Sequence, residues 1–275
     1  MELYTATSRE LAKLLTRRYS TSFSSSSRLF AKNIRPHIYA IYGLVRVADE
    51  IVDTYQGDDM CSLLDNLEHE VLQLLDHDQP FSPNPIVQAF AVTAQQYSIS
   101  DDLITPFFAS MRSDITATTF TQAEYDAYIY GSAEVIGLMC LKVFVGGDAA
   151  QYEQLAPGAS ALGRAYQKVN FLRDIASDHE QRGRWYFPIS SFDAFDTDAK
   201  QSIEADIVKD FAAAVPAIQN LPVGARRAVR LSYRYYSALF DALQQASPAT
   251  IKTQRIRVAG WQKLCLLVTA RVGQS

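Results

Sequence analysis

The sequence has few cysteines and no excess of basic residues, and both shortages exclude classes of protein. Its 275 residues include three cysteines, Cys61, Cys140 and Cys265, which lie far apart and form no C-x-x-C pair. We therefore expect reduced thiols in the core of a cytoplasmic protein, and neither disulfides nor a zinc site. The net charge is −4 and the pI is about 5.6. A nucleic-acid-binding protein usually carries a basic footprint, so we expect no nucleic-acid partner.

Long apolar runs are also missing. The first ten residues carry early charge and no apolar stretch, which argues against a secretory signal or a membrane anchor. The most apolar later stretch, residues 135–145, is short and contains Lys142, whereas a membrane-spanning helix needs about 20 apolar residues. We expect a cytoplasmic protein that is at most peripheral to the inner face of the membrane. The sequence leaves the oligomeric state open.

Alternation of apolar and polar residues, which is typical of strands, is absent, and apolar residues recur at helical spacing. The sequence therefore predicts an all-α fold, with one domain over residues 1–275 that forms a bundle of helices around a central active-site cavity. Helices are expected from an N-cap at Ser8, with Leu11, Leu14 and Leu15 on one face, from Pro36 to about Tyr55, and over about 63–75, 86–97, 101–114, 121–146, 200–219, 222–246 and 252–272. A break is expected at Pro157-Gly158, and loops at the Ser/Thr-rich residues 20–27 and at residues 179–188.

Two rows of oxygen-bearing side chains stand out. Asp49 and Asp53 form the first acidic row, and Asn170, Asp174 and Asp178 form the second, with the same spacing of four residues. On an α-helix, residues four apart lie on one face about one turn from each other. Carboxylates aligned in this way repel each other by a few tenths of a kcal/mol per pair, so we expect a cation between them. Hard oxygen ligands suit Mg²⁺ or Mn²⁺, and the rows predict a metal site that also holds a diphosphate.

Arginines accompany both rows. Arg46 lies three residues before the first acidic row, and Arg173 directly precedes the middle member of the second. Their guanidinium groups can hold diphosphate oxygens that the metals leave uncovered. The alternative is that either row is only a solvated helix face, which is common for a single D-x-x-x-D. Apolar residues surround both rows, in residues 41–47, at Ile51 and Val52, and in residues 169–175, and this argues against full exposure to solvent.

The residues around both rows resemble the motifs of the squalene/phytoene synthase family. Residues 39–53, YAIYGLVRVADEIVD, resemble its first aspartate-rich motif. Residues 167–174, QKVNFLRD, together with residues 183–188, GRWYFP, resemble the second. The resemblance extends from residues 19–23 to residues 255–263. It implies an isoprenoid-synthase-like bundle and an enzyme, a prenyltransferase, that joins two prenyl diphosphates head to head with the help of Mg²⁺ or Mn²⁺.

The resemblance also implies roles for individual residues. The catalytic residues that we expect are Asp49, Asp53, Asp174, Asp178 and Tyr128, and the metal ligands are Asp49, Asp53, Asn170, Asp174 and Asp178. The substrate-binding residues that we expect are Phe23, Ser27, Tyr42, Arg46, Gln167, Arg173, Arg184, Tyr186 and Arg255. For Tyr128 the alternative is an ordinary core position. Two charges, Glu134 and Lys168, depart from the family's pattern, and we hypothesise that they pair across two helices, because either alone would be costly to bury.

The family's reactions differ in substrate length and in the use of a reductant. Phytoene synthase would condense two geranylgeranyl diphosphates through a cyclopropylcarbinyl diphosphate, release diphosphate and need no NADPH. Squalene or dehydrosqualene synthase would use farnesyl diphosphate, and squalene formation would end with NADPH. The run Ser24-Ser25-Ser26-Ser27 after Phe23 favours phytoene and carotenoid biosynthesis, because small side chains one turn beyond Phe23 would leave room for a longer tail. Each further isoprene unit that is buried contributes about 4 kcal/mol.

Two other classes of protein remain open at this stage. One is a non-catalytic relative that binds lipid or assists assembly, and such a protein would not need both acidic rows. The other is a cyclising terpene synthase, whose aspartate motifs look similar. The segment from Arg184 to Pro188 and the presence of Arg255 argue against the second.

Overall fold

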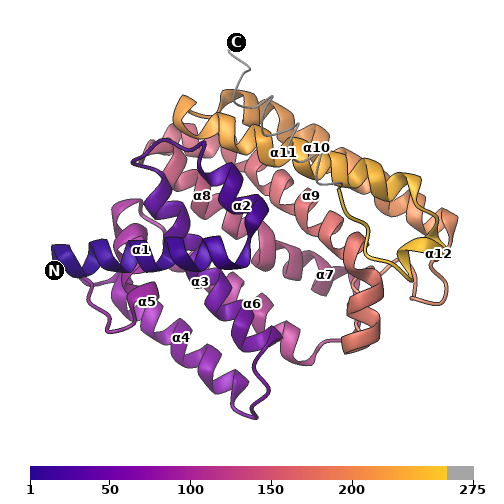
Figure 1. The fold of residues 1–275 in the computed structure, drawn as a ribbon, viewed down its shortest axis with the longest axis horizontal. Coiled ribbons are helices and arrows are strands. Elements are labelled where there is room, and N and C mark those ends of the chain that lie inside the picture. Colours follow the sequence, from indigo (N-terminus) through magenta and orange to yellow (C-terminus); the bar gives the residue numbers. More distant parts are fainter. Residues whose placement is uncertain (259–275) are drawn as a thin grey trace.

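The computed structural model describes residues 1–258, the side chains of residues 21 and 22 excepted, and confirms the all-α prediction, with no strand in this part of the chain. The helices, labelled in Figure 1, are α1 (Glu2–Tyr19), α2 (Thr21–Ser27), α3 (Arg35–Asp53), α4 (Met60–Leu75), α5 (Pro85–Gln96), α6 (Asp101–Thr116), α7 (Gln122–Ile129), the π-helical turn η1 (Tyr130–Glu134), α8 (Val135–Val145), α9 (Ala149–Arg182), α10 (Thr197–Asn220), α11 (Val223–Gln245) and α12 (Pro248–Ile251).

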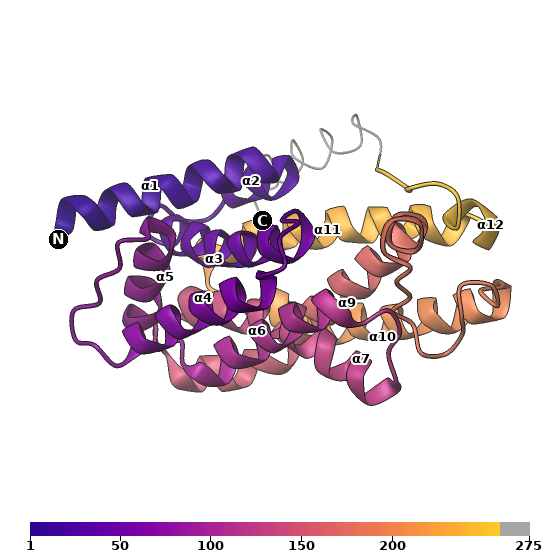
Figure 2. The ribbon, with the colours of Figure 1, turned by 90° about the horizontal axis from the view of Figure 1, so that it is seen from below.

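The long helix α9 is the central element of the bundle. It packs against α8, η1, α10 and α11, while α1 packs against α3 and α5. Figure 2 shows α1, α2 and α11 along one side of the molecule and α4, α6 and α7 along the opposite side. Buried side chains form one large apolar cluster that draws mainly on α3 to α6 and α8, and a second that draws mainly on α7, α9, α10 and α11. Helix α9 thus connects the two halves of the core.

The predicted break at Pro157-Gly158 does not occur, because α9 runs unbroken from Ala149 to Arg182. Gly158 lies where α9 and α10 pack closely, and a Cβ at this position would come within 2.3 Å of the Cβ of Ala217. Proline removes one backbone donor and usually kinks or ends a helix. Here the tertiary contacts of α9 outweigh that local signal.

The N-terminal region differs from expectation in two ways. Helix α1 begins at Glu2, and Ser8, which we expected as its cap, is buried and donates its hydroxyl to the carbonyl of Tyr4 at 2.9 Å. Residues 20–27 do not form a loop, because residues 21–27 are helical in α2 and the Ser20 hydroxyl accepts the backbone N–H of Phe23 at 3.1 Å. A serine-rich segment that is buried against neighbouring helices satisfies its backbone as a helix.

The predicted helix over 121–146 forms, but it contains the π turn η1. Gly131 in this turn packs against α6, where an added Cβ would come within 2.1 Å of the carbonyl oxygen of Pro106. The whole rod Gln122–Val145 is long and apolar enough to cross a membrane by length and composition. Half of its most apolar window is buried inside the bundle, and core helices pass the same test, so this is weak evidence for a membrane span.

Two smaller expectations also changed. Cys61 is exposed on α4 and not in the core, whereas Cys140 is half-buried, and Cys265 lies outside the described residues. The helix expected over 252–272 is not seen in its described part, since α12 ends at Ile251 and residues 252–258 are not helical. The remainder of that prediction lies outside the described residues.

Candidate active site

The first acidic row occupies the last turns of α3. Partial burial raises the pKa of Asp49 to about 7, with the carboxylates of Asp53 and Asp114 adding to the rise and the Arg46 guanidinium opposing it. The Nη1 atom of Arg46 lies 3.7 Å from a carboxylate oxygen of Asp49. Arg46 also pairs with Glu50, which lies one helical turn after it on α3. The first row is therefore a pair of partly buried carboxylates, and Arg46 is 3.7 Å from one of them.

The second acidic row lies in the C-terminal half of α9. Asp174 accepts the Nε donors of Arg173 and Arg255, each at 2.9 Å. Burial raises the pKa of Asp178 to about 6, and the neighbouring Asp174 adds to this rise. Asn170 accepts a hydrogen bond from the Tyr236 hydroxyl of α11 at 3.4 Å.

The two rows lie at the same end of the bundle. Arg182, at the end of α9, pairs with Asp53, at the end of α3, with its Nη1 2.6 Å from a carboxylate oxygen. This ion pair joins residues that lie 129 positions apart in the sequence. The predicted loop over 179–188 begins later than expected, because α9 extends to Arg182 and thereby brings this arginine to the first row.

A further carboxylate, Asp114 on α6, lies close enough to both rows to interact with Asp49, Asp53 and Asp178, and it was missed in the sequence. It accepts the Tyr128 hydroxyl at 2.8 Å and the Tyr186 hydroxyl at 3.3 Å, and it pairs with Arg184 at 2.8 Å. Burial raises the pKa of Asp114, while Arg184 and the two hydroxyl groups oppose the rise. We call Asp114, Tyr128, Arg184 and Tyr186 the Asp114 cluster. Asp114 lies on the buried, mostly apolar face of α6, one turn after Met111. An acidic residue on a face that is otherwise apolar is the sequence signal that could have identified it.

The other expected substrate-binding residues lie in or near the wall of an apolar cavity. The ring of Phe23 stacks on that of Tyr42, with centroids 5.0 Å apart. Phe23 and Gln167 line the cavity, whereas Ser27 does not. Ser27 is buried with its hydroxyl 3.1 Å from the Tyr39 hydroxyl, and its neighbour Ser26 lines the cavity instead.

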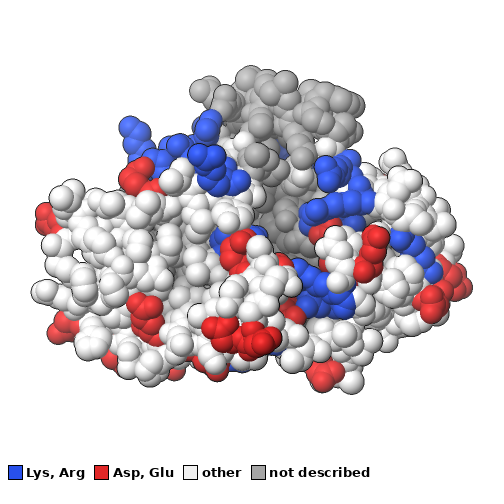
Figure 3. Space-filling model, turned by 60° about the horizontal axis from the view of Figure 1, so that its bottom comes forward, with Lys and Arg blue, Asp and Glu red and all other residues white. Residues whose placement is uncertain are grey.

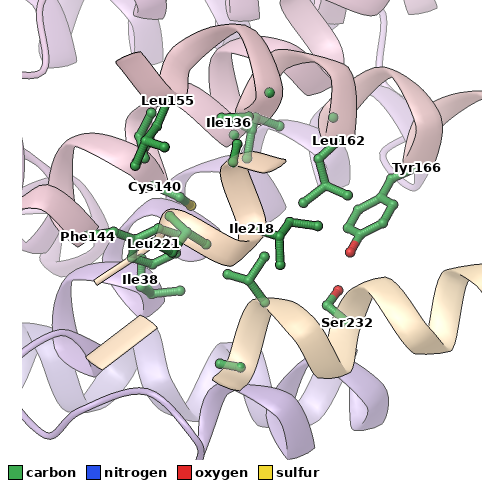
Figure 4. Close-up of a pocket in the computed structure, with 18 of the residues that line it drawn as sticks. Ile38, Ile136, Cys140, Phe144, Leu155, Leu162, Tyr166, Ile218, Leu221 and Ser232 are labelled. Carbon is green, nitrogen blue, oxygen red and sulfur yellow. The ribbon is translucent and has the colours of Figure 1, made fainter. Parts of the chain in front are cut away.

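The cavity itself has a volume of about 250 Å³ and is lined by side chains from α2, α3, η1, α8, α9, α10 and α11. Figure 4 shows Tyr166 and Ser232 at one end and Leu155 and Phe144 at the other. Tyr166 precedes Asn170 of the second acidic row by one helical turn, so the first end is the end nearer to the carboxylates of this row. The lining is almost entirely apolar, which suits a hydrocarbon chain.

Glu134 and Lys168 do not pair with each other, so that hypothesis was wrong. Glu134 accepts from Arg164 at 2.8 Å, and Lys168 pairs with Asp206 and, at 2.7 Å, with Asp210. Arg164 and Asp210 are also paired, at 2.9 Å, so the charges form a chain from η1 through α9 to α10. Glu134 and Lys168 therefore have different partners, because Glu134 faces α9 and Lys168 faces α10.

Arginines, and not a preformed metal cage, meet the carboxylates. Within residues 1–258, no three carboxylate, imidazole or thiolate side chains come together closely enough to hold a metal ion. The guanidinium groups of Arg46, Arg173, Arg182 and Arg255 contact one or the other row, and Arg184 contacts Asp114, which lies close to both. Carboxylates and guanidinium groups at one end of an apolar cavity can together bind a substrate with an anionic head and an apolar tail.

Solved structures share this all-helical fold. A dehydrosqualene synthase in complex with a ligand has a TM-score of 0.80 at 18% identity, over 97% of this chain and 96% of that one. A squalene synthase from Alicyclobacillus acidocaldarius has a TM-score of 0.72 at 19% identity, over 88% of this chain and 95% of that one. At such identities the likeness establishes the bundle alone.

The squalene/phytoene synthase family model matches residues 16–262, and the chain belongs to this family. A 15-cis-phytoene synthase of Synechococcus elongatus is 27% identical over 95% of this chain and 91% of that protein. A phytoene synthase of Arthrospira platensis is 25% identical over 96% of this chain and 92% of that protein. A 4,4'-diapophytoene synthase of Staphylococcus haemolyticus is 25% identical over 70% of this chain and 66% of that protein. The protein is therefore a prenyltransferase that condenses prenyl diphosphates head to head.

Proposed function

We propose that the protein condenses two geranylgeranyl diphosphates to phytoene, through a cyclopropylcarbinyl diphosphate, in carotenoid biosynthesis. The length of the apolar cavity carries this proposal. Along α9 the lining runs from Leu155 to Gln167, about 18 Å at 1.5 Å per residue. An extended chain covers about 3.6 Å per three bonds, so a tail of four isoprene units spans about 19 Å and a tail of three about 14 Å. The cavity matches the longer tail.

The far end of the cavity limits the tail. Phe144 lies there beside Leu155, and the ring of Phe144 stacks on that of Phe30 with centroids 5.2 Å apart. Burying the five carbons of the fourth unit contributes about 4 kcal/mol, or roughly a thousandfold in kcat/KM if it is realised in the transition state. A longer tail would meet these rings, and a shorter one would leave part of the cavity without contacts.

The arginines at the other end bind the diphosphates in this proposal. Arg46, Arg173, Arg182 and Arg255 each contact a carboxylate of the two rows, and each can turn donors toward phosphate oxygens. Guanidinium groups aimed at the bond between the prenyl carbon and the diphosphate oxygen stabilise the charge that develops on the leaving group. The apolar lining keeps water from the carbocation that remains.

The two acidic rows fit Mg²⁺ or Mn²⁺ by the chemistry of their donors. Their hard oxygen donors are the kind that these ions prefer. Burial raises the pKa values of Asp49 and Asp178, and neighbouring carboxylates add to both rises. The proposed ligands are Asp49, Asp53, Asn170, Asp174 and Asp178. A bound divalent ion supplies Lewis acidity to the departing diphosphate. The chain itself positions the tails and the guanidinium groups.

Incubation with labelled geranylgeranyl or farnesyl diphosphate, with Mg²⁺ and with or without NADPH, tests the proposal. We expect phytoene without NADPH, and a kcat/KM for the twenty-carbon substrate well above that for the fifteen-carbon substrate. A clear preference for farnesyl diphosphate would assign the protein to dehydrosqualene or squalene synthesis, and a requirement for NADPH would distinguish between these two. Asp174→Ala should abolish turnover and leave the helical circular dichroism spectrum unchanged. The control Asp148→Ala, which removes the N-cap carboxylate at the other end of α9, should retain turnover.

A further inference from the structure

Two segments that lie far apart in the sequence carry positive charge only. Between residues 11 and 48, and again between residues 211 and 240, every charged side chain is Lys or Arg, although the chain as a whole has a net charge of −4. The segments meet in space, because the backbone N–H of Ala31 donates to the carbonyl of Gly224 at 2.9 Å and α2 packs against α11. Protein surfaces usually mix both signs of charge, so this separation indicates a surface that meets an anionic partner.

The exposed members of the two segments form what we call the basic face: Arg17, Arg18, Arg28, Lys32, Arg227, Arg230 and Arg234. None of them forms an ion pair with an acidic group of residues 1–258. The three arginines of α11 follow a spacing of three and four residues and so share one side of that helix. Figure 3 shows a group of Lys and Arg at its upper left, further Lys and Arg beside Asp and Glu toward its right, and mainly Asp and Glu along its lower edge.

Aliphatic side chains accompany these cations. Leu11 and Leu14 lie on the exposed side of α1, close in sequence to Arg17 and Arg18, and are 40% and 51% exposed. Val223, in the first turn of α11, is 77% exposed. An isolated exposed leucine needs no explanation, but here the apolar and basic side chains occur on the same elements.

The inner side of the same elements forms a wall of the cavity. Phe23 and Ser26 line it from α2, and Ala228 and Val229 line it from α11. Helix α11 therefore presents arginines to the outside and cavity-lining residues to the inside. Figure 2 shows α1, α2 and α11 on one side of the bundle, so a single flat partner could meet all three.

We infer that the basic face docks on the surface of an anionic lipid bilayer. Lipid phosphates complement the cations, and the exposed leucines and valine reach the acyl boundary below the head groups. The inference rests on the proposed function in one respect, because a forty-carbon hydrocarbon needs an apolar phase beside the cavity that releases it. RNA would match the cations alone and would leave the aliphatic side chains in water.

Vesicle co-sedimentation of the full chain without substrate tests the docking independently of the reaction. Vesicles of phosphatidylcholine alone are compared with vesicles that also contain phosphatidylglycerol. We expect binding to the anionic vesicles only, decreasing as salt is raised. In Arg227→Gln/Arg230→Gln the partition coefficient should fall about 25-fold, since each basic residue near such a surface contributes about fivefold. The matched change Lys209→Gln, at an exposed cation of the neighbouring α10, should have no more than a small effect.

Several outcomes would overturn the inference. Equal binding of the wild type to both kinds of vesicle would do so, and so would unchanged binding of the double variant. If vesicles are not bound, binding to RNA, or self-association that the double variant abolishes, would show that the basic face serves that other partner and would overturn the inference. Diphosphate release in detergent, measured on the same preparations, should be unchanged by the double variant. If vesicles are bound but no diphosphate is released, the proposed function fails and the docking surface stands.

Discussion

Replacing Asp114 tests whether the buried Asp114 cluster holds the two halves of the site together. In Asp114→Ala, Arg184 keeps its contact with the main-chain carbonyl of residue 114 and donates to the Tyr186 hydroxyl at 2.8 Å. It loses its buried counter-ion, however, and removing one partner of a buried ion pair costs about 3–5 kcal/mol. Asp114→Asn keeps an oxygen for the Tyr128 hydroxyl and removes only the charge, so we expect a loss of about 2 kcal/mol.

Urea unfolding followed by circular dichroism measures both losses, and at these magnitudes the melting temperature of Asp114→Ala should fall by roughly 10 °C. The decisive comparison is a double-mutant cycle between Asp114→Asn and Arg184→Gln. Because the two side chains are 2.8 Å apart and buried, we expect a coupling free energy above about 1 kcal/mol. A coupling below about 0.3 kcal/mol would refute the reasoning. The same cycle between Asp114→Asn and Lys209→Gln provides the control, since Lys209 lies exposed on α10.

Three further predictions concern pH, chain length and the buried charges. His37 is buried, and its pKa is lowered to about 4 by burial and by Arg9. The stability that the neutral ring contributes is therefore complete above its unfolded pKa of about 6.5 and is lost as the pH falls toward 4. In urea titrations over this pH range, the free energy of unfolding of His37→Gln should decrease by up to about 3 kcal/mol less than that of the wild type. Ser26→Phe should fill part of the cavity and shift the product of mixed substrates toward thirty carbons, and an unchanged product ratio, with Ser26→Ala as control, would contradict this. Lys168→Met should lower the free energy of unfolding by about 3 kcal/mol, because Asp210 keeps only Arg164 as a partner; a loss below 1 kcal/mol in urea would count against the charge chain.

The spacing of the two acidic rows was readable from the sequence because it depends on one helix at a time. Residues four apart share a face whatever the helix packs against, and the apolar residues around Asp49 and Asp174 indicate a partly buried position. The all-α fold follows from the same local periodicity. These features need no knowledge of how the helices cross.

Features that depend on contacts between helices could not be read in this way. Asp114 belongs to no repeat, and its importance appears only when α7 and the segment after α9 bring Tyr128 and Arg184 to it. Glu134 and Lys168 were correctly expected to need partners. Glu134 pairs with Arg164 and Lys168 pairs with Asp210, however, so the two do not pair with each other. Ser8 resembles a helix cap by residue type, yet the packing of α1 against α3 and α5 turns it inward. Non-local geometry decided each case.

The unbroken course of α9 has a consequence for how this enzyme can change during evolution. One rigid helix carries the cavity wall from Leu155 to Gln167 and, directly after it, the second acidic row. Inserting a single residue between them would turn the row by about 100° and advance it by about 1.5 Å relative to the wall. Insertions and deletions in this region should therefore be eliminated by selection. Changes in product length should accumulate as substitutions of side-chain size along the wall, with the register of the helix preserved.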